Sequence, residues 1–397
     1  MTRLKKPVSD IRIEVRMKNV KRTAAFILIS LSALFSASCA QDKPVSSVSE
    51  QDVTETAAVS TTEQPTEPAT EKATKATVEY YDGLICSDTM TEKERDNSGF
   101  REITLFSPEK CFSIGWYRWG VYPDEPAMKK IKDNVRELKL YDEQLDENFL
   151  VHVILPPDYD ENREYPVFLI TDGVTWISRV PKMWNIIRDG EASPVIFVTL
   201  GYDYDVDYRD TTRFNNFILY QDKFLDFITN DLMETISLNY KTDASRSVFF
   251  GHSWGGLFAD YALFHSDNYD KQPFADYIIC SSAFWTMGSK EYWNEFMPEG
   301  YDESIIAEHM ACNRDYDFFD RHERLDKNVW VCAGGRETNT DTIGYNGGDT
   351  VLDNVRDLYD RLIAHGTNAE LKIYEDCYHN NYVEDMLKEY LKEHFPA

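Results

Sequence analysis

The stretch SVFFGHSWGGLFADYALF, residues 247–264, decides the fold of this chain. The apolar run Ser247–Phe250 is typical of a buried strand, and Leu257–Phe264 is typical of a helix. Between them, residues 251–256 contain the pattern Gly-x-Ser-x-Gly centred on Ser253. A sharp strand-to-helix turn strains its central residue, and flanking glycines avoid clashes because they lack a Cβ. The pattern therefore predicts a nucleophilic Ser253; a tight turn in which Ser253 only caps the helix is the alternative.

Strand-like and helix-like segments alternate on both sides of this turn. Further apolar runs predict strands at Phe149–Leu155, Val167–Ile170, Val195–Leu200, Ala275–Cys280, Val329–Cys332 and Leu371–Tyr374. Other segments predict helices at Tyr220–Glu234, Val351–Ala364 and Val383–His394. Continuous apolar strands separated by helices indicate an α/β fold with a mostly parallel central sheet and helices on both faces. Ligands bind at the carboxyl ends of such strands, so the loops there are the place to search for a site.

The base that would activate Ser253 is expected on a loop near the end of the chain. A serine hydroxyl is a weak nucleophile at neutral pH and needs a neighbouring base. After a Gly-x-Ser-x-Gly turn, an acid and then a histidine follow in chain order. His379 comes directly after the last predicted strand and is the predicted base. The other histidines downstream lie in an irregular segment or in helices: His309, His322, His365 and His394.

The acid of the triad is expected in the loop after the strand Val329–Cys332. Glu337 is the first carboxylate in the tight turn that follows this strand, and Asp341 and Asp349 are the alternatives. The acid would hold one tautomer of His379 and stabilise the imidazolium that forms during the reaction.

Two backbone N–H groups are expected to form an oxyanion hole. One belongs to Trp254, the residue after the nucleophile. The other is expected in the loop after the strand Val167–Ile170, at Gly173 or Val174. Such donors stabilise the transition state of acyl transfer by several kcal/mol.

Five motifs in a fixed order carry a resemblance to a known family. They are Leu155–Tyr159, Tyr165–Val167, Thr171–Gly173 with Trp176, Gly251–Gly256 and Ser281–Trp285. With these motifs, residues 135–397 resemble the Putative esterase family, which includes esterase D, the feruloyl esterases and the enterochelin esterases. The resemblance implies an α/β-hydrolase fold and serine-esterase activity that uses no cofactor.

The resemblance also implies which side chains contact the substrate. The candidates are Asp172, Trp176, Arg209 and Trp285. Arg209 and Arg213 both roughly match a family arginine that helps to hold acidic or catecholate substrates. The family's usual Ser-Pro-Ser-x-Trp-Trp segment is altered here, since Ala283 and Thr286 replace parts of it, so the substrate class stays open.

Residues 1–40 are typical of a secretory signal. Basic residues at 18, 21 and 22 precede an apolar run, residues 24–35, and small residues follow it. Met17 is a second candidate for the start of this peptide. Cys39 resembles the lipidated cysteine of a bacterial surface lipoprotein, although Ser36 replaces the usual leucine. Cleavage after Ala40, which would give a secreted or periplasmic protein, is the alternative.

Composition divides the chain between this signal and the sheet into two parts. Residues 41–78 contain no aromatic residue and cannot bury enough apolar surface to offset their ordering entropy, which predicts a disordered Ser/Thr/Glu-rich linker. Residues 79–134 break the strand–helix rhythm and indicate an N-terminal extension that packs on the sheet edge. A ring-stacking platform at Trp116–Trp119 is the alternative. The esterase-like domain is then residues 135–397.

The charge balance disfavours nucleic acid as a partner. The chain has 42 Lys and Arg residues against 69 Asp and Glu residues, which gives a net charge of −27. Such a body repels phosphate backbones. No apolar run that would stay in the mature protein reaches the length of a spanning helix. Membrane contact is therefore expected only through a lipid anchor at Cys39.

The other cysteines and one acidic loop are weaker signals. The six cysteines besides Cys39 permit disulfides, but Cys280 and Cys332 lie inside apolar strands and are expected to be buried thiols. No Cys/His spacing indicates zinc. The acidic loop Asp203–Asp210 lacks the glycine and the glutamate of a calcium loop, which favours a solvated or substrate-mouth loop.

These residues together predict an exported serine esterase that forms an acyl-enzyme. Two substrate classes compete: siderophore-type lactones, and acyl or feruloyl esters linked to carbohydrate. A ligand-binding lipoprotein with an inactive site and an acyltransferase on the same scaffold are the alternatives.

Overall fold

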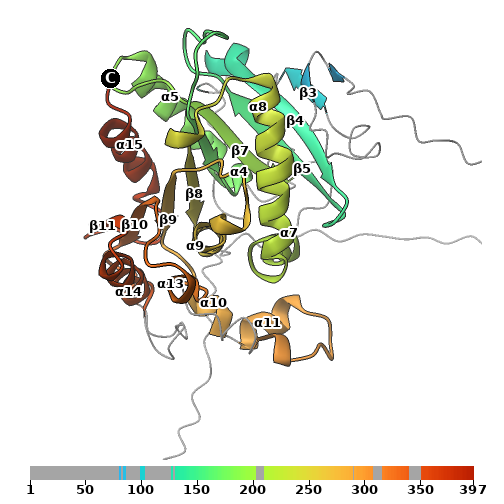
Figure 1. The fold of residues 1–397 in the computed structure, drawn as a ribbon, viewed down its shortest axis with the longest axis vertical. Coiled ribbons are helices and arrows are strands. Elements are labelled where there is room, and N and C mark those ends of the chain that lie inside the picture. Colours follow the sequence, from blue (N-terminus) through green and yellow to red (C-terminus); the bar gives the residue numbers. More distant parts are fainter. Residues whose placement is uncertain are drawn as a thin grey trace, which may run out of the picture. The chain divides into compact units, whose positions relative to one another are not determined.

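A nine-stranded sheet forms the centre of the fold. The computed structural model describes residues 80–81, 84–85, 99–102, 127, 130–202, 210–288, 290–306, 315–338 and 350–397. Within these residues the strands are ordered β11-β10-β9-β8-β6-β7-β5-β4-β3 (Figure 1). Neighbouring strands from β11 to β7 are parallel, and β5, β4 and β3 join antiparallel at the other edge. The predicted α/β fold with a mostly parallel sheet is confirmed.

The strands of the structure can be compared with those predicted from the sequence. The strands of the sheet are β3 Gly99–Glu102, β4 Val135–Asp142, β5 Glu147–Ile154, β6 Val167–Ile170, β7 Ile196–Tyr202, β8 Val248–His252, β9 Asp276–Cys280, β10 Asn328–Gly334 and β11 Asn368–Tyr374. Two further strands, β1 Tyr80–Tyr81 and β2 Leu84–Ile85, pair with each other. All strands predicted from apolar runs are present. Strand β4 was missed because charged residues interrupt its apolar ones, as is common in antiparallel strands near a sheet edge.

Helices connect the strands. The α-helices are α4 Gly173–Trp176, α5 Val180–Arg188, α6 Asp210–Phe214, α7 Gln221–Asp226, α8 Met233–Asn239, α9 Trp254–Phe264, α10 Trp285–Gly288, α11 Lys290–Phe296, α13 Phe318–Arg321, α14 Val351–Ala364 and α15 Val383–His394. Short 3-10 turns lie at η1 Lys132–Asn134, η2 Ile177–Arg179, η5 Ala244–Arg246 and η6 Ser266–Asn268. The predicted bounds of α14 and α15 match the structure.

The predicted helix at Tyr220–Glu234 is correct in type but incomplete. The structure has α7, a π-helical segment η4 at Phe227–Leu232, and α8, which together continue to Asn239. A second π-helical segment, η3, follows α6 at Asn215–Leu219. A π turn contains more residues than an α turn, so the apolar residues after it no longer follow the same spacing. A search for constant helical spacing therefore ends the helix too early.

Two hydrophobic cores lie on opposite faces of the sheet. Helices α5 and α15 cover one face, and α7, α8, α9 and α14 cover the other (Figure 1). The central strands β6 and β8 are buried at every position, as expected for parallel strands covered on both sides. This arrangement fixes the carboxyl ends of β6, β8, β10 and β11, from which the candidate site is built.

The described cysteines are free thiols. Cys280 and Cys332 are buried and unbridged, which confirms the expectation for these two, and Cys377 is free as well. Cys86, Cys111 and Cys312 lie outside the described residues. The predicted signal, its anchor at Cys39 and the linker at residues 41–78 also lie outside them. In the part of the chain that the structure describes, no helix combines the length and apolarity needed to cross a membrane.

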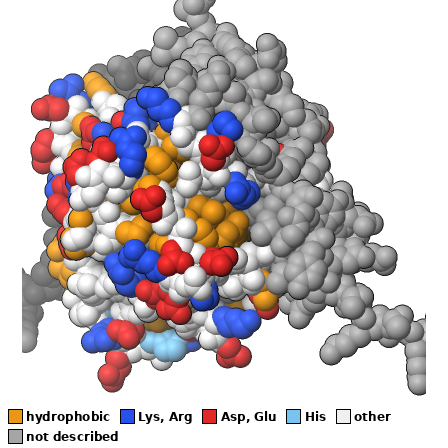
Figure 2. Space-filling model, turned by 90° about the horizontal axis from the view of Figure 1, so that it is seen from above, with side chains coloured by type: hydrophobic (Ala, Val, Ile, Leu, Met, Phe, Trp, Pro, Cys, Tyr) orange, Lys and Arg blue, Asp and Glu red, His pale blue; other side chains and the backbone are white. Residues whose placement is uncertain are grey.

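The surface carries charges of both signs. On the face drawn in Figure 2, basic and acidic side chains of the described residues are interspersed among small apolar areas. Ion pairs on the surface, such as Lys182–Glu384 and Lys392–Glu191, bring charges of opposite sign together.

Candidate active site

Ser253 lies at the turn between β8 and α9, in a backbone conformation that few residues adopt. Its φ is 58° and its ψ is −117°. The flanking glycines are required by close packing, because a Cβ on Gly251 would lie 1.8 Å from the carbonyl oxygen of Gly255. A Cβ on Gly256 would lie 2.7 Å from the carbonyl oxygen of Cys280. The turn therefore has the strained geometry and the steric need for glycine that the Gly-x-Ser-x-Gly pattern predicts.

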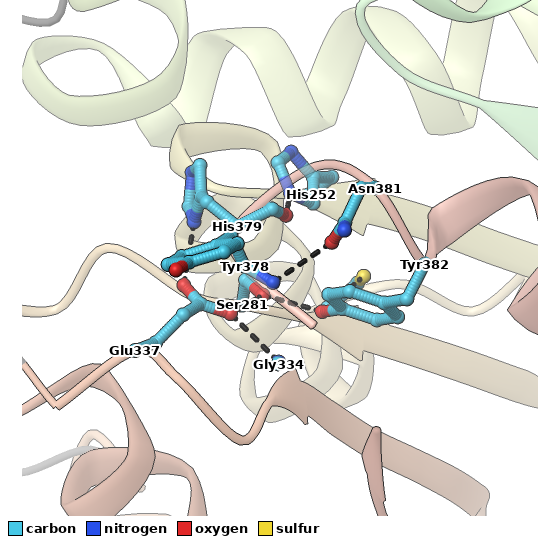
Figure 3. Close-up of polar contacts among 9 residues, drawn as sticks. His252, Ser281, Gly334, Glu337, Tyr378, His379, Asn381 and Tyr382 are labelled. Atoms are coloured by element: carbon cyan, nitrogen blue, oxygen red, sulfur yellow. Dashed lines mark hydrogen bonds and ion pairs between the residues drawn. The ribbon is translucent and has the colours of Figure 1, made fainter. Parts of the chain in front are cut away.

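His379 and Glu337 are joined by a short hydrogen bond at the carboxyl ends of β10 and β11. The distance from His379 Nδ1 to Glu337 Oε2 is 2.6 Å (Figure 3). The His379 side chain is 39% exposed, whereas the Glu337 side chain is 6% exposed. A proton held on Nδ1 leaves Nε2 of the neutral ring unprotonated, which is the state that a general base needs. The structure thus brings the predicted base and the first-choice acid together.

The second carboxylate oxygen of Glu337 is held by two further donors. The backbone N–H of Gly334 donates to Oε1 at 2.7 Å, and the Ser281 hydroxyl donates to the same atom at 2.5 Å. Ser281 has a positive φ of 43° and also contacts the hydroxyl of Tyr382 (Figure 3). Hydrogen bonds of this kind replace the water that a buried carboxylate loses. Sequence reasoning did not identify Ser281 or Tyr382 as contacts of the acid.

The loops that carry Glu337 and His379 touch each other through their backbones. Gly335 N–H donates to the carbonyl oxygen of Tyr374, and Arg336 N–H donates to that of Cys377, both at 2.9 Å. A Cβ on Gly334 would lie 2.6 Å from the carbonyl oxygen of Cys377. Glycine at this position therefore permits the approach on which the Glu337–His379 bond depends.

His252, the residue before Ser253, contacts His379. Its Nε2–H donates to the carbonyl oxygen of His379 at 2.7 Å. The two imidazole rings have centroids 4.5 Å apart, and the Trp176 ring packs edge-on against His252 at 5.1 Å. Burial holds the pKa of His252 well below its usual value of 6.5, and the neighbouring His379 lowers that pKa further. His252 therefore remains neutral and donates to the His379 loop.

The depressed pKa of His252 predicts a loss of stability in mild acid. In the unfolded chain the ring binds a proton near pH 6.5, while the folded ring does not, so the stabilising effect is complete above pH 6.5 and declines as the pH falls. The loss should approach about 1.4 kcal/mol per pH unit. Urea unfolding at several pH values should show a shallower decline for His252→Gln. The exposed His322→Gln is the control, and an equally shallow decline there would contradict the assignment.

The predicted oxyanion donors begin two neighbouring helices. Trp254 is the first residue of α9, and Gly173 and Val174 are the first two of α4. A Cβ on Gly255 would lie 2.8 Å from Thr171 Oγ1, so the start of α9 lies against the turn that precedes α4. The first N–H groups of a helix have no partner within the helix. Both predicted donors therefore come from positions where an N–H group can serve a ligand.

The predicted substrate contacts have different surroundings. Asp172 is buried, and both of its carboxylate oxygens accept hydrogen bonds from Arg213 at 2.7 Å. Trp176 is buried against His252, and Trp285 is half-buried at the start of α10. The remaining predicted residues lie outside the described residues: Cys39, Arg209, Asp341 and Asp349. The acidic loop Asp203–Asp210 is also mostly outside them. Among the residues that are described, no group of three or more His, Cys, Asp or Glu side chains is arranged to hold a metal ion.

Comparison with known proteins identifies the family. The model of the Putative esterase family matches residues 143–379, and the chain belongs to this family. A relative from Aspergillus fumigatus, named siderophore triacetylfusarinine C esterase, is 27% identical over 158 residues. That match covers 35% of this chain and 52% of the relative, so the chain spans about half the length of this curated relative.

The solved structure of EstB supports the fold. The siderophore hydrolase EstB from Aspergillus nidulans is 20% identical, with a TM-score of 0.50 over 66% of this chain and 96% of that chain. The BES protein from Bacillus cereus is also 20% identical, with a TM-score of 0.49 over 66% of this chain and 95% of that chain. Together with the family match, the likeness to EstB identifies an α/β-hydrolase-type fold.

Proposed function

We propose that this protein is an exported serine esterase in which Ser253, His379 and Glu337 form the catalytic triad. The observation that carries the proposal is the 2.6 Å bond between His379 and Glu337, which lies beside the turn that holds Ser253. Membership of the Putative esterase family supports ester hydrolysis as the reaction. Each of the three residues comes from the carboxyl end of a different parallel strand, where α/β folds place their sites.

The reaction follows from the chemistry of these groups. Nε2 of His379 takes the proton of Ser253 as its hydroxyl oxygen attacks the ester carbonyl carbon. The backbone N–H groups of Trp254 and of Gly173 or Val174 bind the oxyanion of the tetrahedral intermediate. The intermediate then expels the alcohol, which receives the proton from His379. Water attacks the acyl-enzyme with His379 again as base, which releases the carboxylic acid and restores Ser253.

We favour siderophore-type lactones over carbohydrate-linked acyl or feruloyl esters as substrates. The named activity of the Aspergillus fumigatus relative supports this choice. The candidate contacts are Asp172, Trp176, Arg209 and Trp285. We also place the protein outside the cytoplasm, anchored by a lipid at Cys39, with secretion after cleavage at Ala40 as the alternative.

A substrate comparison tests this function. The purified protein is incubated with triacetylfusarinine C, with a cyclic catecholate-serine trilactone and with methyl ferulate, and products are followed by mass spectrometry. We expect kcat/KM for at least one siderophore to exceed that for methyl ferulate by about tenfold or more. Faster release of ferulate would assign carbohydrate-linked esters instead. Transfer of the acyl group to an added alcohol in place of water would indicate an acyltransferase, and tight binding without turnover would indicate a binding lipoprotein.

A further inference from the structure

The two halves of the predicted oxyanion hole come from different parts of the chain. Gly173 and Val174 follow β6, whereas Trp254 follows β8, about 80 residues later. Removing one donor from such a hole lowers kcat by about 10²–10³-fold, so the donors need a fixed separation. An element that contacts both turns would set that separation.

Arg213, at the end of α6, contacts the first turn through an ion pair. Its Nε and Nη2 donate to the two carboxylate oxygens of Asp172, each at 2.7 Å. The side chains of Arg213 and Asp172 are 9% and 5% exposed. Asp172 directly precedes Gly173 and has a positive φ of 52°. Paired, parallel hydrogen bonds of this kind fix orientation as well as distance, so they hold Asp172 in this conformation.

The same guanidinium contacts the second turn. Its central carbon lies 4.9 Å from the centroid of the Trp254 ring, within the range of a cation–π interaction. The indole is fixed by a hydrogen bond as well, since Trp254 Nε1–H donates to Thr286 Oγ1 at 3.1 Å. Phe214 and Phe296 pack edge-on against the ring. Trp254 is therefore held on several sides, and Arg213 is the side chain that links it to Asp172.

We propose that Arg213 and Asp172 are positioning residues that hold the two halves of the oxyanion hole in register. The proposal rests on the proposed function. It gives Asp172 a role other than substrate contact, because both of its carboxylate oxygens are bonded to Arg213 and both side chains are buried. The pair would stabilise the transition state indirectly, by positioning the N–H groups of Gly173 and Trp254. A positioning role affects kcat, because the oxyanion forms only during the reaction, whereas a substrate contact affects KM.

The test uses hydrolysis of p-nitrophenyl butyrate, with active sites counted from the mass of the fluorophosphonate adduct. Removing one member of a buried ion pair leaves an unpaired charge in the interior, which destabilises the folded protein. We therefore compare Arg213→Lys, which keeps the charge, with the double variant Asp172→Asn/Arg213→Met, which removes both charges. Per labelled site, we expect the double variant to lose about 10–100-fold in kcat with KM within about twofold. Arg213→Lys should fall between it and the wild type. Arg361→Met, which breaks the Arg361–Asp315 pair on α14, is the matched control and should keep its kcat.

The outcomes separate the possible roles. A rise in KM with unchanged kcat would overturn the proposal in favour of substrate contact. An unchanged kcat per labelled site, with only lower thermal stability, would overturn it in favour of a purely structural pair. If the unchanged protein neither hydrolyses the ester nor forms the adduct, the proposed function fails and the positioning role fails with it.

Discussion

Replacing Ser253 with alanine should lower kcat by at least about 10⁴-fold, because the acyl-enzyme can then no longer form. Alanine keeps the Cβ of serine, so the strained turn with φ of 58° should persist and the free energy of unfolding should change little. The decisive measurement is the intact mass after incubation with a fluorophosphonate. Wild-type protein should gain one adduct and the Ser253→Ala variant none.

The nearby Ser282 provides a control for this experiment. Its hydroxyl is buried and has no hydrogen-bond partner among the residues that the structure describes. The Ser282→Ala variant should therefore label at the wild-type rate. Undiminished turnover or labelling in the Ser253→Ala variant would mean that another residue is the nucleophile, and the proposed mechanism would be wrong.

The second large effect is expected from Glu337→Gln, with a loss of about 10⁴-fold in kcat, similar to the loss when the acid of a serine protease triad becomes an amide. Gly334 N–H and Ser281 Oγ both donate to Oε1, so this position favours the amide oxygen of a glutamine. The amide NH₂ would then face Nδ1 of His379. The imidazole of His379 would then carry its proton on Nε2, and a protonated Nε2 cannot accept the proton of Ser253.

The matched control is Glu375→Gln, because Glu375 lies on the loop of the base but its side chain is exposed. Kinetics with p-nitrophenyl butyrate should show a near-normal kcat for this variant. Glu337→Asp keeps the charge on a shorter side chain and should retain part of the activity. Full activity of Glu337→Gln would transfer the role of the acid to Asp341 or Asp349.

Much of the fold was predictable because its central strands have a simple signal. The parallel strands are buried on both faces, so they appear in the sequence as unbroken apolar runs such as Val167–Ile170. Strand β4 and the π-helical segments lack such a signal. In β4, charged residues such as Arg136 and Glu137 interrupt the apolar ones, and in η4 the helical period changes within one element. A search for constant periods therefore finds the buried central strands, but it misses the strand near the sheet edge and the π-helical segments.

The site shows the same division. Ser253 and His379 could be chosen as the predicted nucleophile and base because local rules point to them: glycines surround a strained turn, and a histidine follows the last strand. The contacts that support them are not local. Ser281 meets Glu337 across 56 positions, and Arg213 meets Asp172 across 41. A single sequence states which residues are present but not which distant ones pair, so these supporting contacts emerged only from the three-dimensional arrangement.

The close packing of Gly334 and Gly335 has a consequence for attempts to alter this enzyme. A Cβ on Gly335 would lie 2.5 Å from the carbonyl oxygen of Glu375, so the backbones of the two loops already touch. We therefore expect a substitution that shifts either loop to move both Glu337 and His379. Directed evolution toward new substrates would do better to leave Gly334 and Gly335 unchanged.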